Sequence, residues 1–171
     1  MLDKPRLTLL AIIMMLLISQ TSLASCKVLI TQDRPVLKSI DLGDAGKSQG
    51  DLLFGEAAIR YNRKIVGKVG LMLTTIELPD PTLTGREANE DRFGSLVFRF
   101  SEIDTLIVSG TTLLPPEQKL IAINTPQARA IIGGTGRFKF SRGQVMTTRF
   151  SDGTYEHEFE LDGPGRLCRF K

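Results

Sequence analysis

The sequence has 171 residues, of which 42% are hydrophobic and 24% are charged, and its formal net charge is +3. A chain of this length fits one domain with a sizeable core. It contains no basic block with interleaved aromatic residues, the pattern typical of proteins that bind nucleic acids. We therefore expect no nucleic-acid partner.

The first predicted element is a signal peptide at residues 1–24. Lys4 and Arg6 precede an apolar run over residues 7–18, and residues 20–24 are small or polar. The apolar run is too short for a convincing membrane span. Cleavage removes one acidic and two basic residues, which lowers the net charge from +3 to +2. We therefore expect a secreted or periplasmic protein in which residues 26–171 form a single domain.

Almost every later segment has the pattern of a β-strand. A loop containing Pro35 follows the first strand, residues 62–63 join the second and third, and a proline-broken loop covers residues 78–85. No amphipathic helix or internal repeat is found. The eight predicted strands cover residues 27–31, 52–61, 65–78, 94–101, 105–114, 119–132, 144–150 and 154–161.

Eight mostly antiparallel strands in one small domain indicate a sandwich or a barrel. The two cysteines, Cys26 and Cys168, lie at opposite ends of the mature chain, and in an exported protein they suggest a disulfide. In an up-and-down barrel with an even number of strands, the first and last strands are antiparallel neighbours, which brings these cysteines together. The fold class predicted is thus an eight-stranded antiparallel β-barrel.

Cys26 has a second interpretation. Residues 23–26 also fit a bacterial lipobox, in which Cys26 is lipidated and anchors the protein to a membrane. Neither cysteine has a histidine or cysteine neighbour at metal-ligand spacing, so we expect no metal site.

A glycine-rich segment, with Gly133, Gly134 and Gly136, follows an apolar run. A phosphate-binding loop would lead into a helix, whose N-terminus supplies the N–H groups. Here strand, Asp-Gly turn and strand follow instead. The glycines are therefore predicted to form a tight structural turn between strands.

Strand alternation identifies candidate polar residues in the interior. In residues 154–161, Tyr155 and His157 share a face with Phe159 and Leu161, while three glutamates occupy the other face. At the end of the strand over residues 94–101, Glu102 falls in phase with the apolar face of Leu96, Phe98 and Phe100. A lone inward histidine is often a hydrogen-bonded core residue, and Glu102 at a strand end is free to turn into water.

Several segments resemble the dirigent proteins and allene oxide cyclases. The similarity lies in residues 50–54 and 66–70, in the glycine segment 131–138 with Arg142-Gly143, and in the cysteine pair. Asp33 resembles a dirigent aspartate after the first strand, and Arg142 matches the arginine after the glycine turn. Where many dirigent proteins carry an aspartate before the final hairpin, this chain reads Gln127-Ala128-Arg129.

The resemblance implies an eight-stranded barrel with an apolar cavity, often trimeric, that works without a cofactor. Such barrels hold short-lived unsaturated molecules and control their ring closure or coupling. We therefore expect a cavity that binds a small apolar or aromatic molecule and guides its stereoselective cyclisation or coupling. The catalytic candidates are Asp33, Arg142, His157 and Tyr155.

Structural alternatives accompany each of these assignments. Asp33 also suits a turn-capping role, and Arg142 a surface ion pair. At the level of the whole protein, a non-catalytic carrier of a small ligand and a structural barrel with a filled interior remain open. A homo-oligomer, trimer or dimer, is the only protein partner expected.

Overall fold

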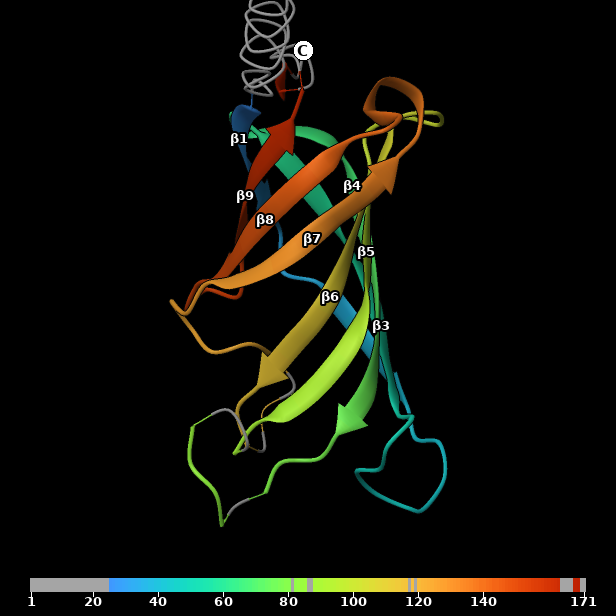
Figure 1. Cartoon of the computed structure of the whole chain (residues 1–171), viewed down its shortest axis with the longest axis vertical. Coiled ribbons are helices and arrows are strands. Elements are labelled where there is room, and N and C mark those ends of the chain that lie inside the picture. The colour runs from blue at the N-terminus through green and yellow to red at the C-terminus, as the bar shows by residue number, and fades with distance from the viewer. Residues whose placement is uncertain are drawn as a thin grey trace, which may run out of the picture.

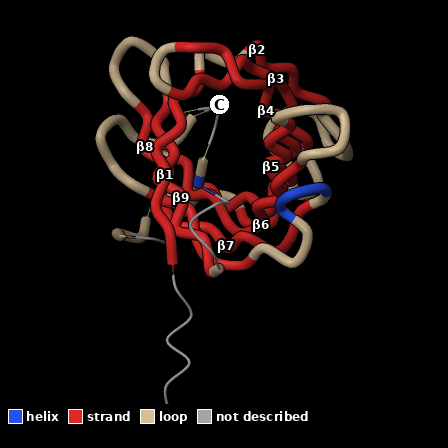
Figure 2. The backbone as a smooth tube through the Cα atoms, turned by 90° about the horizontal axis from the view of Figure 1, so that it is seen from above, coloured by secondary structure: helices blue, strands red, loops and turns tan. Residues whose placement is uncertain are grey.

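The computed structural model describes residues 25–80, 82–85, 88–116, 118, 120–163 and 168–169. The predicted signal peptide, residues 1–24, lies outside the described residues. The described part of the chain forms an eight-stranded antiparallel closed β-barrel. Seen from above, its strands make a closed ring (Figure 2).

The barrel is built from nine strand segments within the described residues. They are β1 (Ser25–Gln32), β2 (Val36–Ile40), β3 (Leu52–Tyr61), β4 (Lys64–Glu77), β5 (Glu90–Arg99), β6 (Thr105–Leu114), β7 (Gln127–Gly134), β8 (Arg142–Arg149) and β9 (Tyr155–Asp162). Neighbouring strands pair in the order β1-β9-β8-β7-β6-β5-β4-β3-β2 (Figure 1).

The ring is closed by the first strand. β1 pairs antiparallel with β9 from Ser25 opposite Asp162 to Gln32 opposite Tyr155. Its last two residues, Thr31 and Gln32, also pair with β3. Closure leaves the long antiparallel ladder without an open edge along most of its length.

The sequence-based prediction placed residues 36–40 in a loop, and this is wrong. These residues form β2, which continues along β3 where β1 ends. β1 and β2 are two pieces of one barrel strand, broken at residues 33–35. Pro35 cannot donate a ladder hydrogen bond, which accounts for the break.

Two strands also begin well away from their predicted start, whereas the others differ by at most two residues at their ends. The strand expected over 119–132 is confined to Gln127–Gly134, because Asn124 adopts a positive φ of 55° and Pro126 follows. The strand expected to start at residue 94 begins at Glu90. Its first three residues are charged and buried.

Side chains inside the barrel form two regions along its axis. The end near the disulfide is filled by apolar residues, among them Phe98, Phe138 and Phe159. Phe159 meets Phe98 edge to face at a ring distance of 4.9 Å. Toward the opposite end, Tyr155 packs in a separate small cluster with Leu114 and Ile121.

The disulfide joins Cys26 and Cys168, whose Cα atoms are 6.0 Å apart. It ties the start of β1 to the segment after β9, as predicted. Lipidation would require the Cys26 sulfur, which is bonded to Cys168 in this structure. Among the described residues, no helix is long and apolar enough to cross a membrane.

Candidate functional site

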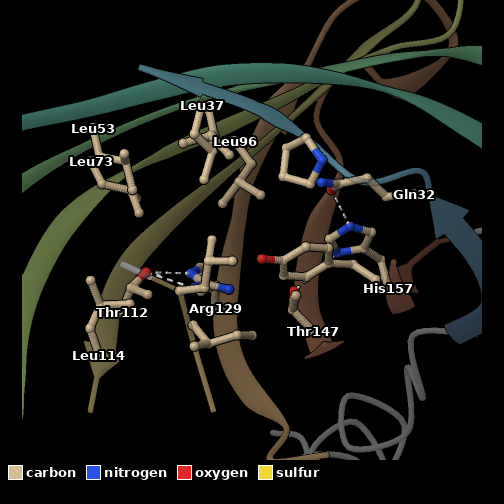
Figure 3. Close-up of a pocket in the computed structure, with 15 residues that line it drawn as sticks. Gln32, Leu37, Leu53, Leu73, Leu96, Thr112, Leu114, Arg129, Thr147 and His157 are labelled. Atoms are coloured by element: carbon tan, nitrogen blue, oxygen red, sulfur yellow. Dashed lines mark hydrogen bonds between the residues drawn. The ribbon is translucent and has the colours of Figure 1, made fainter. Parts of the chain in front are cut away.

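A pocket lies inside the barrel (Figure 3). Its residues Gln32 and Tyr155 lie at the end of the β1–β9 ladder opposite Cys26. Its apolar wall comes mainly from leucines on β2 to β6, and its polar side from β1 and β6 to β9. The polar lining residues are Gln32, Thr112, Arg129, Thr147, Tyr155 and His157. Inward alternation puts them there: Gln32 follows Ile30 on β1, and Tyr155 and His157 precede Phe159 on β9.

The pocket has a volume of about 50 Å³. Pockets that enclose drug-sized ligands measure roughly 300–1,000 Å³. Pro35, Leu37, Leu71 and Leu120 are only half-buried, so this part of the lining meets solvent. The pocket is therefore small and partly open to solvent.

His157 is completely buried, and both of its ring nitrogens have partners. Nε2 lies 2.8 Å from Gln32 Oε1, and Nδ1 lies 3.1 Å from Thr147 Oγ1. The Gln32 oxygen is an acceptor, so Nε2–H donates to it and Nδ1 accepts from the Thr147 hydroxyl. Burial, assisted by the positive charge of Arg129, lowers the pKa of His157 to about 3. The imidazole is therefore neutral at physiological pH.

Tyr155 lies next to His157 on the same face of β9. Its ring stacks against the imidazole, with 6.5 Å between centroids and 8° between planes. Burial raises the pKa of the Tyr155 phenol, although the nearby Arg149 and Arg129 act in the opposite direction. Tyr155 therefore lines the pocket as a neutral hydroxyl donor.

Arg129 is the one cation in the described lining of the pocket. The residue is 6% exposed, and its Nε and Nη2 atoms donate to Thr112 Oγ1 at 3.2 and 2.6 Å. In Figure 3 the guanidinium extends into the space between Thr112 and His157. Burial lowers the pKa of Arg129 to about 10, so the group stays positively charged near neutral pH.

Asp33 lies in the break between β1 and β2 and is not among the lining residues. Its two carboxylate oxygens each accept a hydrogen bond from Arg60 at 2.8 Å. These bonds lower the pKa of Asp33. The pair ties the broken strand to β3.

Arg142 also lies away from the pocket, at the start of β8. Its Nη1 atom donates to the backbone oxygens of Ile132 and Ser141, each at 2.8 Å. Glu102 is exposed in the bend before β6. Of the four catalytic candidates, the structure thus brings together only Tyr155 and His157.

The glycine segment connects β7 to a short 3₁₀ turn, η1 (Gly136–Phe138). Gly136 has a φ of 57°, and a Cβ placed on it would lie 2.2 Å from Asp104 Oδ1. A side chain at Gly134 would meet Thr105 O at 2.4 Å. The chain needs glycine here for close backbone approach, at the end of the barrel away from the pocket.

A charged cluster lies at the end of the barrel beyond the pocket. The fully buried Glu90 accepts hydrogen bonds from Arg92 and from Thr75, and Lys47 lies 3.1 Å from its second oxygen. Asp51 accepts from the backbone N–H groups of Leu42 and Ser48. These contacts fix the loop over residues 41–51 at this end, seen at the bottom of Figure 1.

Sequence reasoning missed Arg129, Thr112, Thr147 and Gln32. In β7 the more apolar set of alternate residues faces outward, whereas Arg129 is buried. The one sequence signal for the inward position of Arg129 is that it lies two residues before the buried Ile131, on the same face of the strand. Gln32 could have been found by extending the β1 alternation past Ile30.

No protein-family model matches the sequence, and no curated protein matches it. Among solved structures, a pyocyanin demethylase superposes with a TM-score of 0.58 at 19% identity, over 81% of this chain and 99% of that one. The Diels–Alderase AbmU from Streptomyces koyangensis gives 0.59 at 13% identity, over 96% and 82%. The pterocarpan synthase dirigent protein GePTS1 gives 0.54 at 16%, over 85% and 89%.

At these identities the likeness shows the fold. The chain has the barrel fold of the dirigent proteins and cyclases, as predicted from the sequence.

Proposed function

We propose that the barrel binds one small, largely apolar molecule in the pocket and guides its cyclisation or coupling. The observation that carries this proposal is the interior site itself. Leucines from several strands surround a Tyr155 hydroxyl and an Arg129 guanidinium, both held inside the barrel. Such a site fixes both the shape and the orientation of a ligand.

Catalysis in this proposal depends on conformational control and electrostatics. The leucine wall selects a folded ligand conformer in which the reacting atoms are close. Tyr155 then donates a hydrogen bond to negative charge that develops on a ligand oxygen, while the Arg129 cation orients the ligand. His157 acts as a positioning residue, because its nitrogens hold Gln32 and Thr147 while its ring stacks on Tyr155.

The proposal gives Asp33 and Arg142 no ligand contact, since each has partners outside the pocket. Solved barrels of this fold support cyclisation as the reaction class, since they include a Diels–Alderase and a pterocarpan synthase dirigent protein. These activities belong to those proteins and set the expectation for this one.

A non-catalytic carrier is the second candidate. It is favoured by His157, whose two nitrogens are both engaged and whose pKa of about 3 leaves it neutral. No acidic residue occurs in the described lining either, so the site has no evident general acid or base. A carrier would bind the same ligand and return it unchanged.

The test uses two neighbouring residues of β4. Leu73 faces the pocket, whereas Met72 is 57% exposed on the outer surface. We expect Leu73→Phe to weaken binding of indole at least tenfold by filling the pocket, and Met72→Phe to leave it unchanged. Isothermal titration calorimetry measures both. Equal binding by both variants would contradict the pocket as the site.

Enzyme and carrier are then separated by the ligand. Solvent extraction of the purified protein and mass spectrometry identify the co-purified molecule. If the barrel is an enzyme, incubation with an open-chain precursor yields the cyclised or coupled product with one stereoisomer in excess. Return of unchanged precursor, or the product ratio found without protein, identifies a carrier.

We further propose that residues 1–24 direct export, so that the barrel works in an oxidising compartment. The Cys26–Cys168 disulfide supports this, because such bonds persist outside the cytosol. The mass of the mature protein tests it. The proposal requires a chain starting near Ser25 with two hydrogens lost, and a diacylglycerol mass on Cys26 would instead show a membrane-anchored protein.

A further inference from the structure

The Arg129 side chain has an unusual feature for a group so deeply buried. Its Nε and Nη2 atoms both donate to Thr112, but the buried Nη1 atom has no hydrogen-bond partner in the part of the chain described here. Buried polar atoms are nearly always paired, so an orphaned donor in a pocket wall points to a missing acceptor.

The charge of Arg129 is likewise uncompensated. Thr112 supplies a neutral hydroxyl, and no aspartate or glutamate occurs among the described lining residues. The buried Glu90 of the charged cluster beyond the pocket is already engaged by Arg92 and Lys47. A cation taken out of water without a counter-ion is costly, and the protein retains it in this site.

The pocket also indicates the sign and the number of charges on the missing partner. One guanidinium balances one negative charge, and the adjoining Tyr155 hydroxyl is a second donor that lies in the same lining. The remaining wall is apolar leucine, which suits a hydrocarbon body. A phosphate dianion would leave one charge unbalanced among these leucines, whereas a carboxylate would not.

We infer that the natural ligand carries a single carboxylate, which binds Arg129 Nη1 while the apolar part lies against the leucine wall. This inference rests on the proposed function, since it names the ligand class of the same pocket. It makes Arg129 the residue that selects acids over neutral analogues of equal shape.

Benzoate and benzamide test the inference, because they share one ring and differ in charge. Calorimetry at pH 7 on the unmodified protein should give an affinity for benzoate at least ten times that for benzamide. Equal affinities, or a preference for benzamide, would overturn the carboxylate assignment while leaving the pocket as a binding site. If neither these compounds nor indole binds, the proposed function itself fails.

Two variants locate the selectivity. In Arg129→Met the preference for benzoate should disappear, whereas Lys38→Gln, which removes one positive charge from the exposed strand β2, should retain it. Without ligand, Arg129→Met should unfold at a higher urea concentration than the unmodified protein, since it removes an unpaired buried charge. A preference that survives in Arg129→Met would overturn the role of Arg129.

Two further measurements complete the design. Should Arg129→Met fail to fold, Arg129→Lys keeps the charge but loses the planar donor set, and its benzoate preference should fall several-fold.

Sodium nitrate distinguishes an organic acid from an inorganic anion. Stabilisation against heat by nitrate equal to that by benzoate would overturn the organic carboxylate in favour of a simple anion site.

Discussion

His157 shows how burial decides the chemistry of a single side chain. An imidazole between Gln32 and Thr147, with Phe98 4.9 Å away edge to face, is fully buried, so a positive charge on it would be poorly solvated. The pKa of about 3 follows from this burial and from Arg129. The residue therefore maintains the geometry of the pocket as a neutral hydrogen-bonding group.

This burial predicts a specific pH dependence of stability. The unfolded chain binds a proton at His157 below a pKa of about 6.5, whereas the folded protein does so only below about 3. The stability that depends on neutral His157 is thus fully present above pH 6.5 and is lost as the pH falls from 6.5 to 3. We expect a loss of about 2–4 kcal/mol across that window.

Urea unfolding at pH 7, 5.5 and 4 measures this loss, with His157→Gln as the control variant. The glutamine does not titrate, so its unfolding free energy should decline less over the same range. Parallel curves for the two proteins would contradict the assignment of the pH dependence to His157.

At the scale of single elements, the connection between β7 and β8 depends on one glycine. Gly136 has a φ of 57°, and a Cβ would contact Asp104 Oδ1 at 2.2 Å and Ile103 O at 2.7 Å. We expect Gly136→Ala to lower the unfolding free energy by roughly 2–4 kcal/mol, because both the backbone conformation and the contact become unfavourable.

Gly70→Ala provides the matched control for that measurement. No atom lies within 4 Å of a Cβ at Gly70, and its φ is not positive. Its unfolding free energy, measured in urea, should be unchanged or slightly higher. Similar losses in both variants would show that the turn geometry is not the cause.

Elements with strict alternation could be predicted from the sequence, and irregular ones could not. In β9 the apolar residues and glutamates separate cleanly onto two faces, so both its boundaries and its inward residues were accessible. β2 gave no such signal because most of its residues are exposed. β7 gave a misleading one, because Ala128, Ala130 and Ile132 face outward while Arg129 lies inside.

The site was harder to predict than the fold, because it combines residues from distant strands. Gln32 and His157 are 125 positions apart, and only the pairing of β1 with β9 brings them together. Buried charges such as Arg129 and Glu90 contradict the usual pattern of polar residues facing water. Their burial depends on partners that a local pattern does not contain.

On the scale of the whole molecule, the disulfide joins residues 142 positions apart. It therefore encloses nearly the whole barrel in one covalent loop. A loop of this length limits the unfolded chain strongly, and the chain-entropy model gives a stabilisation of up to about 5 kcal/mol. We expect Cys26→Ser with Cys168→Ser to fold but to lose a few kcal/mol.

Urea unfolding with and without a reductant measures this contribution. The reduced protein and the double variant should unfold at the same lower midpoint, and indole should still bind both below that midpoint. A midpoint unaffected by reductant would contradict the role of the bond.

The trimer or dimer implied by the resemblance stays a prediction, which sedimentation equilibrium tests.

The two regions of the barrel interior have a consequence for how such a protein evolves. Most of the large apolar core residues gather at the disulfide end, and most residues that would touch a ligand gather at the other, with Leu96 belonging to both sets. Substitutions at the pocket can therefore accumulate without dismantling the core. Barrels of this fold keep their shape at 13–19% identity, and this separation offers a physical route by which one architecture acquires new ligands.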